Sequence, residues 1–245
     1  MKTAWVFPGQ GSQKIGMGQD VIDLTDAKER FQYASEIFEK DLFGICQNNS
    51  DNVSLELDLN NTKNTQICLF LVESILLDAL KNNGHEPNFL AGHSLGEISA
   101  LYAGNVLSFQ DCVSLIKFRS ELMANAAEGS MAAIIGFDRQ ELDSLILGID
   151  NLVIANDNSS SQVVLSGSKN SLDQISKSIK CKRFISLNVS GAFHSHFMEE
   201  PSNQFSKYLD NVAFNQSTYN IISNSNPTFS DKSAEIKDRL KNQMC

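Results

Sequence analysis

Ser94 lies in the pentapeptide Gly-His-Ser-Leu-Gly, which occupies positions 92–96. The apolar stretch 88–94 predicts a strand, and the stretch 96–105 predicts a helix. A strand-turn-helix with glycines two positions either side of the serine is typical of a nucleophile elbow, although the pentapeptide alone also occurs by chance. We therefore expect Ser94 to be an acyl nucleophile, with the backbone N–H of Leu95 near the helix N-terminus stabilising an oxyanion.

A serine nucleophile needs a base, and the chain has four histidines. His93 adjoins the serine and should point away from it, and His85 lies in a turn where we expect it to be solvated. His194 and His196 alternate along the stretch 191–197, which we interpret as extended, so one of the two should face the serine. An H-x-H pair can also bind a metal, but no Cys, Asp or Glu cluster accompanies it, so no metal site is expected.

Arg119 is the most informative polar residue outside the motif. Its helix carries Leu115, Ile116, Leu122 and Met123 at −4, −3, +3 and +4, which places the arginine inside the apolar stripe. A guanidinium in such a place needs an anion. Two interpretations remain open: a buried ion pair with an Asp or Glu, or a substrate carboxylate held by two hydrogen bonds.

The elements that must position these residues follow from the apolar periodicity. A first strand at 3–7 leads into the glycine-rich loop 8–13. That loop is not a nucleotide-binding motif, because Lys14 occupies the third glycine position and no Gly-Lys-Ser/Thr follows. Helices are expected at 27–42, 64–84 and 108–127, the last opened by a capping box of Ser108 and Asp111.

The chain changes character near residue 130. Strands are predicted at 131–137, 151–157, 161–168 and 181–190, and helices at 138–148 and 169–180. This β-α-β-β-α-β order is that of a ferredoxin-like unit. We therefore predict an α/β protein whose main body comprises residues 1–129 and 191–245, with an inserted subdomain at 130–190; a polar turn before the third of these strands would contain Asn156.

Composition and charge limit the classes of binding partner and the compartment that the sequence is compatible with. The 245 residues carry a net charge of −9 with a pI near 4.9, which disfavours nucleic acid as a partner but allows a local basic patch. Five scattered cysteines without a C-x-x-C pair indicate a reducing compartment such as the cytosol. No signal peptide is recognised at the N-terminus, and Glu73 interrupts the longest apolar run, at 67–77, so no membrane span is expected.

Six segments together resemble the malonyl-CoA:acyl carrier protein transacylase family over essentially the whole chain. They are VFPGQGSQ at 6–13, GHSLGE at 92–97, FRSELM at 118–123, GSMAAIIG at 129–136, QVVLSG at 162–167 and GAFHSHFM at 191–198. The resemblance implies an α/β-hydrolase-like body with a parallel sheet and a ferredoxin-like insert. It also implies a cytoplasmic enzyme (or one of an organelle stroma) without cofactor or metal, which moves malonyl from coenzyme A to Ser94 and then to the phosphopantetheine thiol of acyl carrier protein.

The same resemblance implies a role for each site residue. Ser94 would be the nucleophile, His194 the base and later the acid, and Arg119 the clamp on the malonyl carboxylate. The remaining roles are the oxyanion hole from the backbone N–H groups of Gln10 and Leu95, the acyl pocket walls Met123 and Phe193, Asn156 near the substrate, and a backbone carbonyl near Gln243 that orients the histidine.

Family members continue for several tens of residues past the point that matches 240–245, in a segment that packs against the main sheet. We therefore expect Gln243 to fray and its orienting contact to weaken. Lys117, Lys182 and Arg183 are candidates for carrier docking, and a solvated surface explains them equally well.

Two other functions stay open at this point. One is a serine esterase or thioesterase on the same fold, which would have no use for a buried cation beside the serine. The other is a truncated, non-catalytic relative that binds an acyl carrier. A related enzyme option is an acyltransferase domain of a polyketide synthase; the start at "MKTAWVF" favours a discrete protein.

Overall fold

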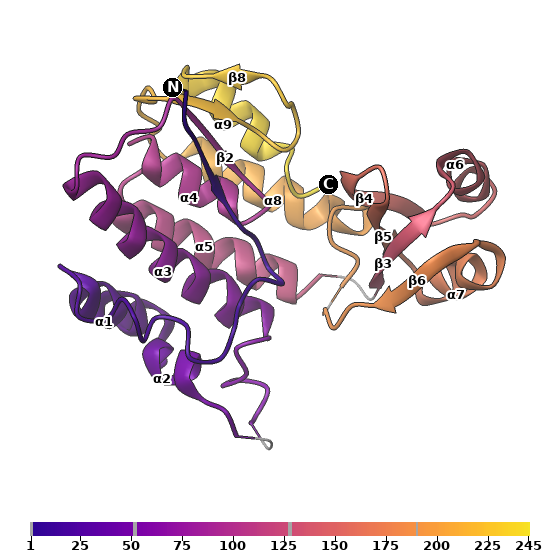
Figure 1. The fold of residues 1–245 in the computed structure, drawn as a ribbon, viewed down its shortest axis with the longest axis horizontal. Helices are drawn as coiled ribbons and strands as arrows, with labels where there is room; N and C mark the ends of the chain where they lie inside the picture. Colours follow the sequence, from indigo (N-terminus) through magenta and orange to yellow (C-terminus); the bar gives the residue numbers. More distant parts are fainter. Residues whose placement is uncertain (1, 51–52, 127–128, 190) are drawn as a thin grey trace. The chain divides into compact units, whose positions relative to one another are not determined.

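The computed structural model describes residues 2–50, 53–126, 129–189 and 191–245 (Figure 1). The chain divides into two compact units, which are described separately. The larger comprises Met1–Glu121 and Ser206–Gln243, and the smaller comprises Leu122–Phe205 and Met244–Cys245.

The larger unit is built on a four-stranded sheet. Its strands are β1 (Ala4–Phe7), β2 (Phe89–Gly92), β7 (Asn220–Ile222) and β8 (Phe229–Ser230), in the order β1-β2-β7-β8. The first three are parallel and β8 is antiparallel to β7. This confirms the predicted parallel sheet and brings the carboxyl ends of β2 and β7 to one edge, where ligands of such sheets usually bind.

Helices lie between and after these strands along the chain. The bounds are α1 (Ala27–Phe38), α2 (Leu42–Gln47), α3 (Thr62–Asn82), α4 (Gly96–Ala103), α5 (Phe109–Ala124), α8 (Glu199–Asp210) and α9 (Ser233–Lys241). The apolar helix predicted at 64–84 is confirmed as α3, whose first half is buried nearly all round. The predicted capping box is also confirmed: Asp111 N–H donates to Ser108 Oγ at 3.1 Å, and Ser108 N–H donates to the Asp111 carboxylate at 3.4 Å.

One helix prediction was too long. Residues 27–42 were expected as a single helix, but α1 ends at Phe38 and α2 begins at Leu42. Glu39 adopts a left-handed conformation, with φ 55°, and the Asp41 carboxylate then caps α2 by accepting from Gly44 N–H at 2.8 Å. The side-chain cap thus starts a new helix where periodicity alone continues the old one.

The main sheet has one buried and one exposed face. Phe7, Leu90 and Ile221 point to the buried face, against which α4 packs through β1 and β2. Side chains alternate along a strand, so the opposite face presents Val6, which is 70% exposed, and Phe229, which is 62% exposed. Parallel sheets are usually covered on both faces, so this apolar surface is unusual.

The smaller unit has the predicted β-α-β-β-α-β order. Its elements are β3 (Ser130–Phe137), α6 (Arg139–Leu147), β4 (Leu152–Ser159), β5 (Gln162–Gly167), α7 (Lys169–Ser178) and β6 (Cys181–Ser186). The strands form an antiparallel sheet in the order β4-β5-β3-β6, which is the ferredoxin-like arrangement. Ile134, Val163, Leu165 and Ile175 are fully buried at its core.

Two local expectations in this unit were wrong. The stretch 156–162, expected as one polar turn, is not one, because β4 continues to Ser159 and the turn is only two residues long. Asn156 therefore lies within β4, opposite Val164, rather than in a loop. The last three polar residues of β4, at 157–159, are exposed on an edge strand, where they are tolerated without apolar alternation.

Among the residues described, no helix is long and apolar enough to cross a membrane.

Candidate active site

The elbow around Ser94 is confirmed as a sharp strand-turn-helix. β2 ends at Gly92, α4 begins at Gly96, and Ser94 between them adopts a left-handed conformation, with φ 52°. A Cβ on Gly92 would lie 1.9 Å from the carbonyl carbon of Gly96, and one on Gly96 would lie 2.2 Å from the carbonyl oxygen of Phe7. Both glycines are thus required for the close approach, and the turn holds the serine in a conformation that non-glycine residues seldom adopt.

The glycine-rich loop after β1 packs directly on this elbow. A Cβ on Gly9 would lie 2.3 Å from the carbonyl oxygen of His93, and Ser12 closes the loop by donating from N and Oγ to the Gly9 carbonyl. The backbone N–H groups of Gln10 and Leu95 donate to none of the described residues. Two neighbouring segments therefore carry N–H groups with no described acceptor close to the serine, an arrangement that suits an oxyanion.

Arg119 lies fully buried beside the nucleophile, as its place in the apolar stripe predicted. Its Nη2 donates to Ser94 Oγ at 3.0 Å and to Gln243 Oε1 at 2.8 Å, and its Nη1 donates to Gln66 Oε1 at 2.7 Å. Burial lowers the pKa of Arg119 to about 10, against the opposing effect of the Glu97 charge, so the side chain is cationic at neutral pH.

No carboxylate among the described residues forms an ion pair with Arg119 within 4 Å. Its hydrogen-bond partners in the described structure are two amides and a hydroxyl, all neutral, and its Nε–H has no partner there. The buried ion pair that the sequence left open is therefore absent from the described residues. A buried cation held by neutral groups leaves room for an anionic ligand.

Gln243 is an integral part of this site rather than a fraying end. Its side chain is 3% exposed, and its Nε2 donates to the Ser94 carbonyl at 2.7 Å and to Glu97 Oε2 at 2.9 Å. The expectation that it would fray was wrong, because three side-chain hydrogen bonds to buried or half-buried partners outweigh its position near the end of the chain. Its Oε1 faces Arg119 at the same time.

Sequence reasoning missed Glu97 and Asn224. Glu97 is fully buried in the first turn of α4, and Asn224 follows β7 at the carboxyl edge of the sheet. Asn224 Oδ1 accepts from Ser94 N–H at 3.2 Å, and its Nδ2 donates to the Gly92 carbonyl at 2.8 Å. A polar residue at the end of a parallel strand was the available signal for Asn224.

The stretch that holds the candidate bases is not extended, contrary to expectation. It forms a turn at His194, whose φ is 57°, followed by the short 3-10 helix η1 (His196–Met198). Ser195 causes this, because its Oγ donates to the Ala192 carbonyl at 2.6 Å and accepts from Phe197 N–H at 3.3 Å. His194 is half-buried and His196 is exposed.

The other two histidines, His85 and His93, are both exposed, as expected for His85 in its turn. Met123 and Phe193 are buried, and Asn156 is half-buried. The larger unit brings together Ser94, Leu95, Gln10, Arg119 and Gln243, whereas the smaller unit contains His194, Met123, Phe193 and Asn156. No group of three or more His, Cys, Asp or Glu in the described ranges could hold a metal ion.

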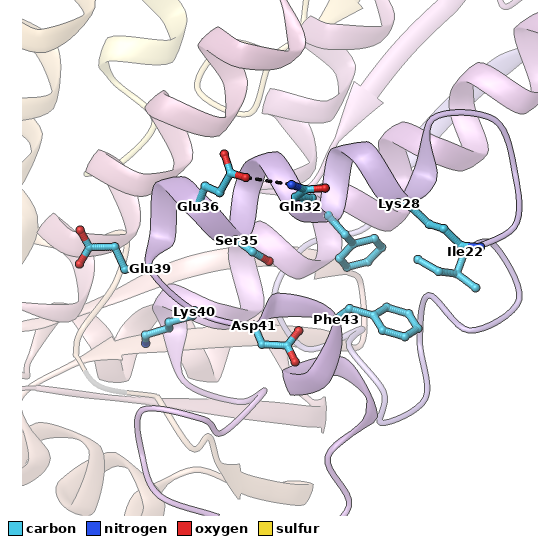
Figure 2. A pocket seen from close by; sticks show the side chains of 10 residues that line it. Ile22, Lys28, Gln32, Ser35, Glu36, Glu39, Lys40, Asp41 and Phe43 are labelled. Carbon is cyan, nitrogen blue, oxygen red and sulfur yellow. Dashed lines mark hydrogen bonds between the residues drawn. The ribbon is translucent and has the colours of Figure 1, made fainter.

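A separate cavity of about 730 Å³ lies along α1 and α2 (Figure 2). Phe31, Phe43 and Ile22 form its apolar part, and Gln32 on α1 donates to Glu36 at its edge. None of the candidate site residues lines it. This cavity therefore takes no part in the chemistry of Ser94.

Comparison with known proteins agrees with the site. Residues 4–241 match the family model of the acyl transferase domain. The malonyl CoA-acyl carrier protein transacylase of Synechocystis is 45% identical over 244 residues, which is 100% of this chain and 81% of the relative.

Solved structures give the same result. The crystal structure of a malonyl-CoA:ACP transacylase from Synechocystis has a TM-score of 0.94 and 44% identity, covering 100% of this chain and 81% of that one. A malonyl-transacylase in complex with a type II polyketide synthase acyl-carrier protein has a TM-score of 0.89 and 28% identity. The match covers 100% of this chain and 81% of that chain.

Proposed function

The chain belongs to the acyl transferase family, and from that premise we propose how its residues perform the transfer. Its activity is malonyl transfer from coenzyme A to acyl carrier protein, a reaction of fatty acid biosynthesis. Malonyl-CoA is the donor, and acyl carrier protein is the protein partner.

In the first half-reaction Ser94 Oγ attacks the thioester carbonyl of malonyl-CoA, and His194 takes the hydroxyl proton. The N–H groups of Gln10 and Leu95 hold the oxyanion of the tetrahedral intermediate. The C–S bond then breaks, and coenzyme A leaves as a thiol with the proton from His194. In the second half-reaction the phosphopantetheine thiol of acyl carrier protein attacks the Ser94 ester, and the same groups act in reverse.

The single observation that carries this proposal is the hydrogen bond from the buried Arg119 guanidinium to Ser94 Oγ. An acyl group on Ser94 is thereby held next to a cation that no described carboxylate neutralises. Malonyl has a carboxylate to place there, whereas acetyl has none and would leave the cation without an anion. A simple esterase gains nothing from such a cation, so this bond favours malonyl transfer over hydrolysis.

The remaining roles are proposed on the family resemblance. Met123 and Phe193 wall the acyl pocket, Asn156 lies near the substrate, and the backbone near Gln243 orients His194. We also propose a body of residues 1–129 and 191–245 with an insert at 130–190. A cytoplasmic or stromal location is supported by the five cysteines, all free thiols.

Intact-protein mass spectrometry tests the proposal directly. Incubation with malonyl-CoA, without carrier protein, should add one malonyl group on Ser94, and added pantetheine should remove it. Ser94→Ala should give no adduct while keeping its circular dichroism spectrum, and Ser99→Ala, at a buried serine of the following helix, is the control. A malonyl adduct retained in Ser94→Ala, or none in the folded wild type, would refute the proposal.

A further inference from the structure

Asn224 touches no reacting atom, yet it holds the backbone on the N-terminal side of the nucleophile. Its Oδ1 accepts from the N–H of Ser94, and its Nδ2 donates to the carbonyl of Gly92, two residues earlier. These two bonds span the segment whose backbone turns from strand into helix. An asparagine amide, with one acceptor and two donors, can satisfy both groups at once.

The Ser94 conformation needs such support. A left-handed backbone at a non-glycine residue is disfavoured by the clash of its Cβ and persists only when its surroundings impose it. Gln243 holds the carbonyl of Ser94 at 2.7 Å, and Asn224 holds its N–H at 3.2 Å. Each side of the strained residue is thus fixed by one side-chain amide.

Glu97 anchors both amides on a single carboxylate oxygen. Its Oε2 accepts from Gln243 Nε2 at 2.9 Å, from Asn224 N–H at 3.1 Å and from Asn224 Nδ2. Glu97 is fully buried and forms no ion pair within the described residues. A buried carboxylate is costly unless several donors hold it, so its position fixes where the two amides lie.

We propose that Asn224, anchored by Glu97, is a positioning residue that holds Ser94 in the left-handed conformation from which its hydroxyl attacks the thioester. This inference rests on the proposed role of Ser94 as nucleophile. No hydrogen bond joins Asn224 to Arg119. Its effect should therefore fall on the rate of acylation and leave the recognition of the malonyl carboxylate unchanged.

The test compares Asn224→Ala with Asn226→Ala, a substitution of an exposed asparagine in the same loop that bonds Thr228 and not the elbow. In single-turnover acylation, Asn224→Ala should slow the reaction at least tenfold with malonyl-CoA and by the same factor with acetyl-CoA. The KM for malonyl-CoA should match that of Asn226→Ala. An acylation rate equal to that of Asn226→Ala, or a changed malonyl-to-acetyl ratio, would overturn the proposal.

Asn224→Asp adds a second readout, the pH dependence of the acylation rate, which a merely structural role of Asn224 would not change. It keeps the acceptor for Ser94 N–H but places a second carboxylate against Glu97, and this pair binds a shared proton as the pH falls. Its acylation rate relative to wild type should therefore rise as the pH falls, because the protonated form regains a donor. A relative rate that is independent of pH would contradict the proposal.

Amide exchange separates this proposal from the proposed function. In ¹⁵N-labelled protein the Ser94 N–H should exchange at least tenfold faster in Asn224→Ala than in wild type, whether or not the serine is acylated. Absence of the wild-type malonyl adduct would defeat the function alone, whereas unchanged exchange at Ser94 would defeat the positioning role alone.

Discussion

Replacement of Arg119 by alanine should convert a malonyl-selective site into one that scarcely distinguishes malonyl from acetyl. The guanidinium is fully buried, and three of its five N–H donors are used in the described structure, by Gln66, Ser94 and Gln243. The Ser94 bond is released when that oxygen becomes an ester, which frees a donor for the substrate. The malonyl carboxylate can then accept two charge-assisted hydrogen bonds from one planar group.

The size of the effect follows from those two bonds. Hydrogen bonds to charged groups contribute about 1.5–3 kcal/mol each, so their joint loss removes about 3–6 kcal/mol from malonyl transfer. Since about 1.4 kcal/mol is tenfold, kcat/KM for malonyl-CoA should fall by roughly 10²–10⁴. Acetyl has no carboxylate and makes neither bond, so its transfer should be little affected. The ratio of kcat/KM for malonyl-CoA to that for acetyl-CoA should therefore fall by a factor of the same order.

The assay is single-turnover acylation with each thioester, followed by intact mass. Arg119→Lys tests the fork geometry, because lysine keeps the charge but cannot bind a carboxylate with two parallel N–H groups. Arg30→Ala is the matched control: Arg30 is also largely buried, pairs with Asp78 and lies away from Ser94. An unchanged malonyl-to-acetyl ratio in folded Arg119→Ala, or an equal change in Arg30→Ala, would refute the clamp.

Two further predictions concern groups that the clamp does not involve. Burial raises the pKa of Glu73 to about 8, against the lowering effect of its bond from Ser99, so the folded protein holds a proton that the unfolded chain releases at lower pH. The free energy of unfolding should therefore fall as the pH rises from about 4.5 to about 8, and Glu73→Gln should flatten this slope in urea unfolding series. A slope equal to that of wild type would contradict it. His194→Asn should slow acylation by roughly 10²–10⁴, whereas His196→Asn, at an exposed side chain, should leave the rate within about twofold; equal rates in the two variants would exclude His194 as the base.

The elbow could be predicted from the sequence because its cause is local. Gly92 and Gly96 are needed wherever a strand turns this sharply into a helix, and the clash of a Cβ does not depend on distant residues. The place of Arg119 in an apolar stripe was equally accessible, since four neighbours on one helix decide it. The order of elements at 130–189 followed from alternating periodicities for the same reason.

The failures arose where side-chain hydrogen bonds override periodicity. The alternation argument for His194 and His196 assumed an extended chain, and the Ser195 hydroxyl instead stabilises a turn and η1. Asp41 likewise begins a new helix inside a periodic stretch. Neither bond changes the apolar pattern, so a reading of apolar spacing cannot detect it.

The contacts that complete the site were inaccessible for a different reason, since they join residues far apart in the sequence. Gln243 reaches the Ser94 carbonyl across 149 positions, and Asn224 reaches Glu97 across 127. A single sequence shows each of these as an ordinary polar residue. Their function depends on β2, β7 and the chain after α9 meeting at one edge of the sheet, which periodicity does not specify.

The placement of Glu97 explains how a buried cation can be stabilised and still bind substrate. Its carboxylate is separated from the Arg119 guanidinium by one amide, that of Gln243, which donates to the carboxylate and accepts from the guanidinium. A direct pair would neutralise the cation, and breaking such a buried pair costs about 3–5 kcal/mol, which malonyl would have to overcome on binding. With the amide between them, the Glu97 charge still favours the cationic form of Arg119 from a distance. It raises the pKa of Arg119, against the lowering effect of burial. The guanidinium donors thus remain bonded to neutral acceptors. A substrate carboxylate displaces a neutral acceptor at a lower free-energy cost than it would displace a carboxylate.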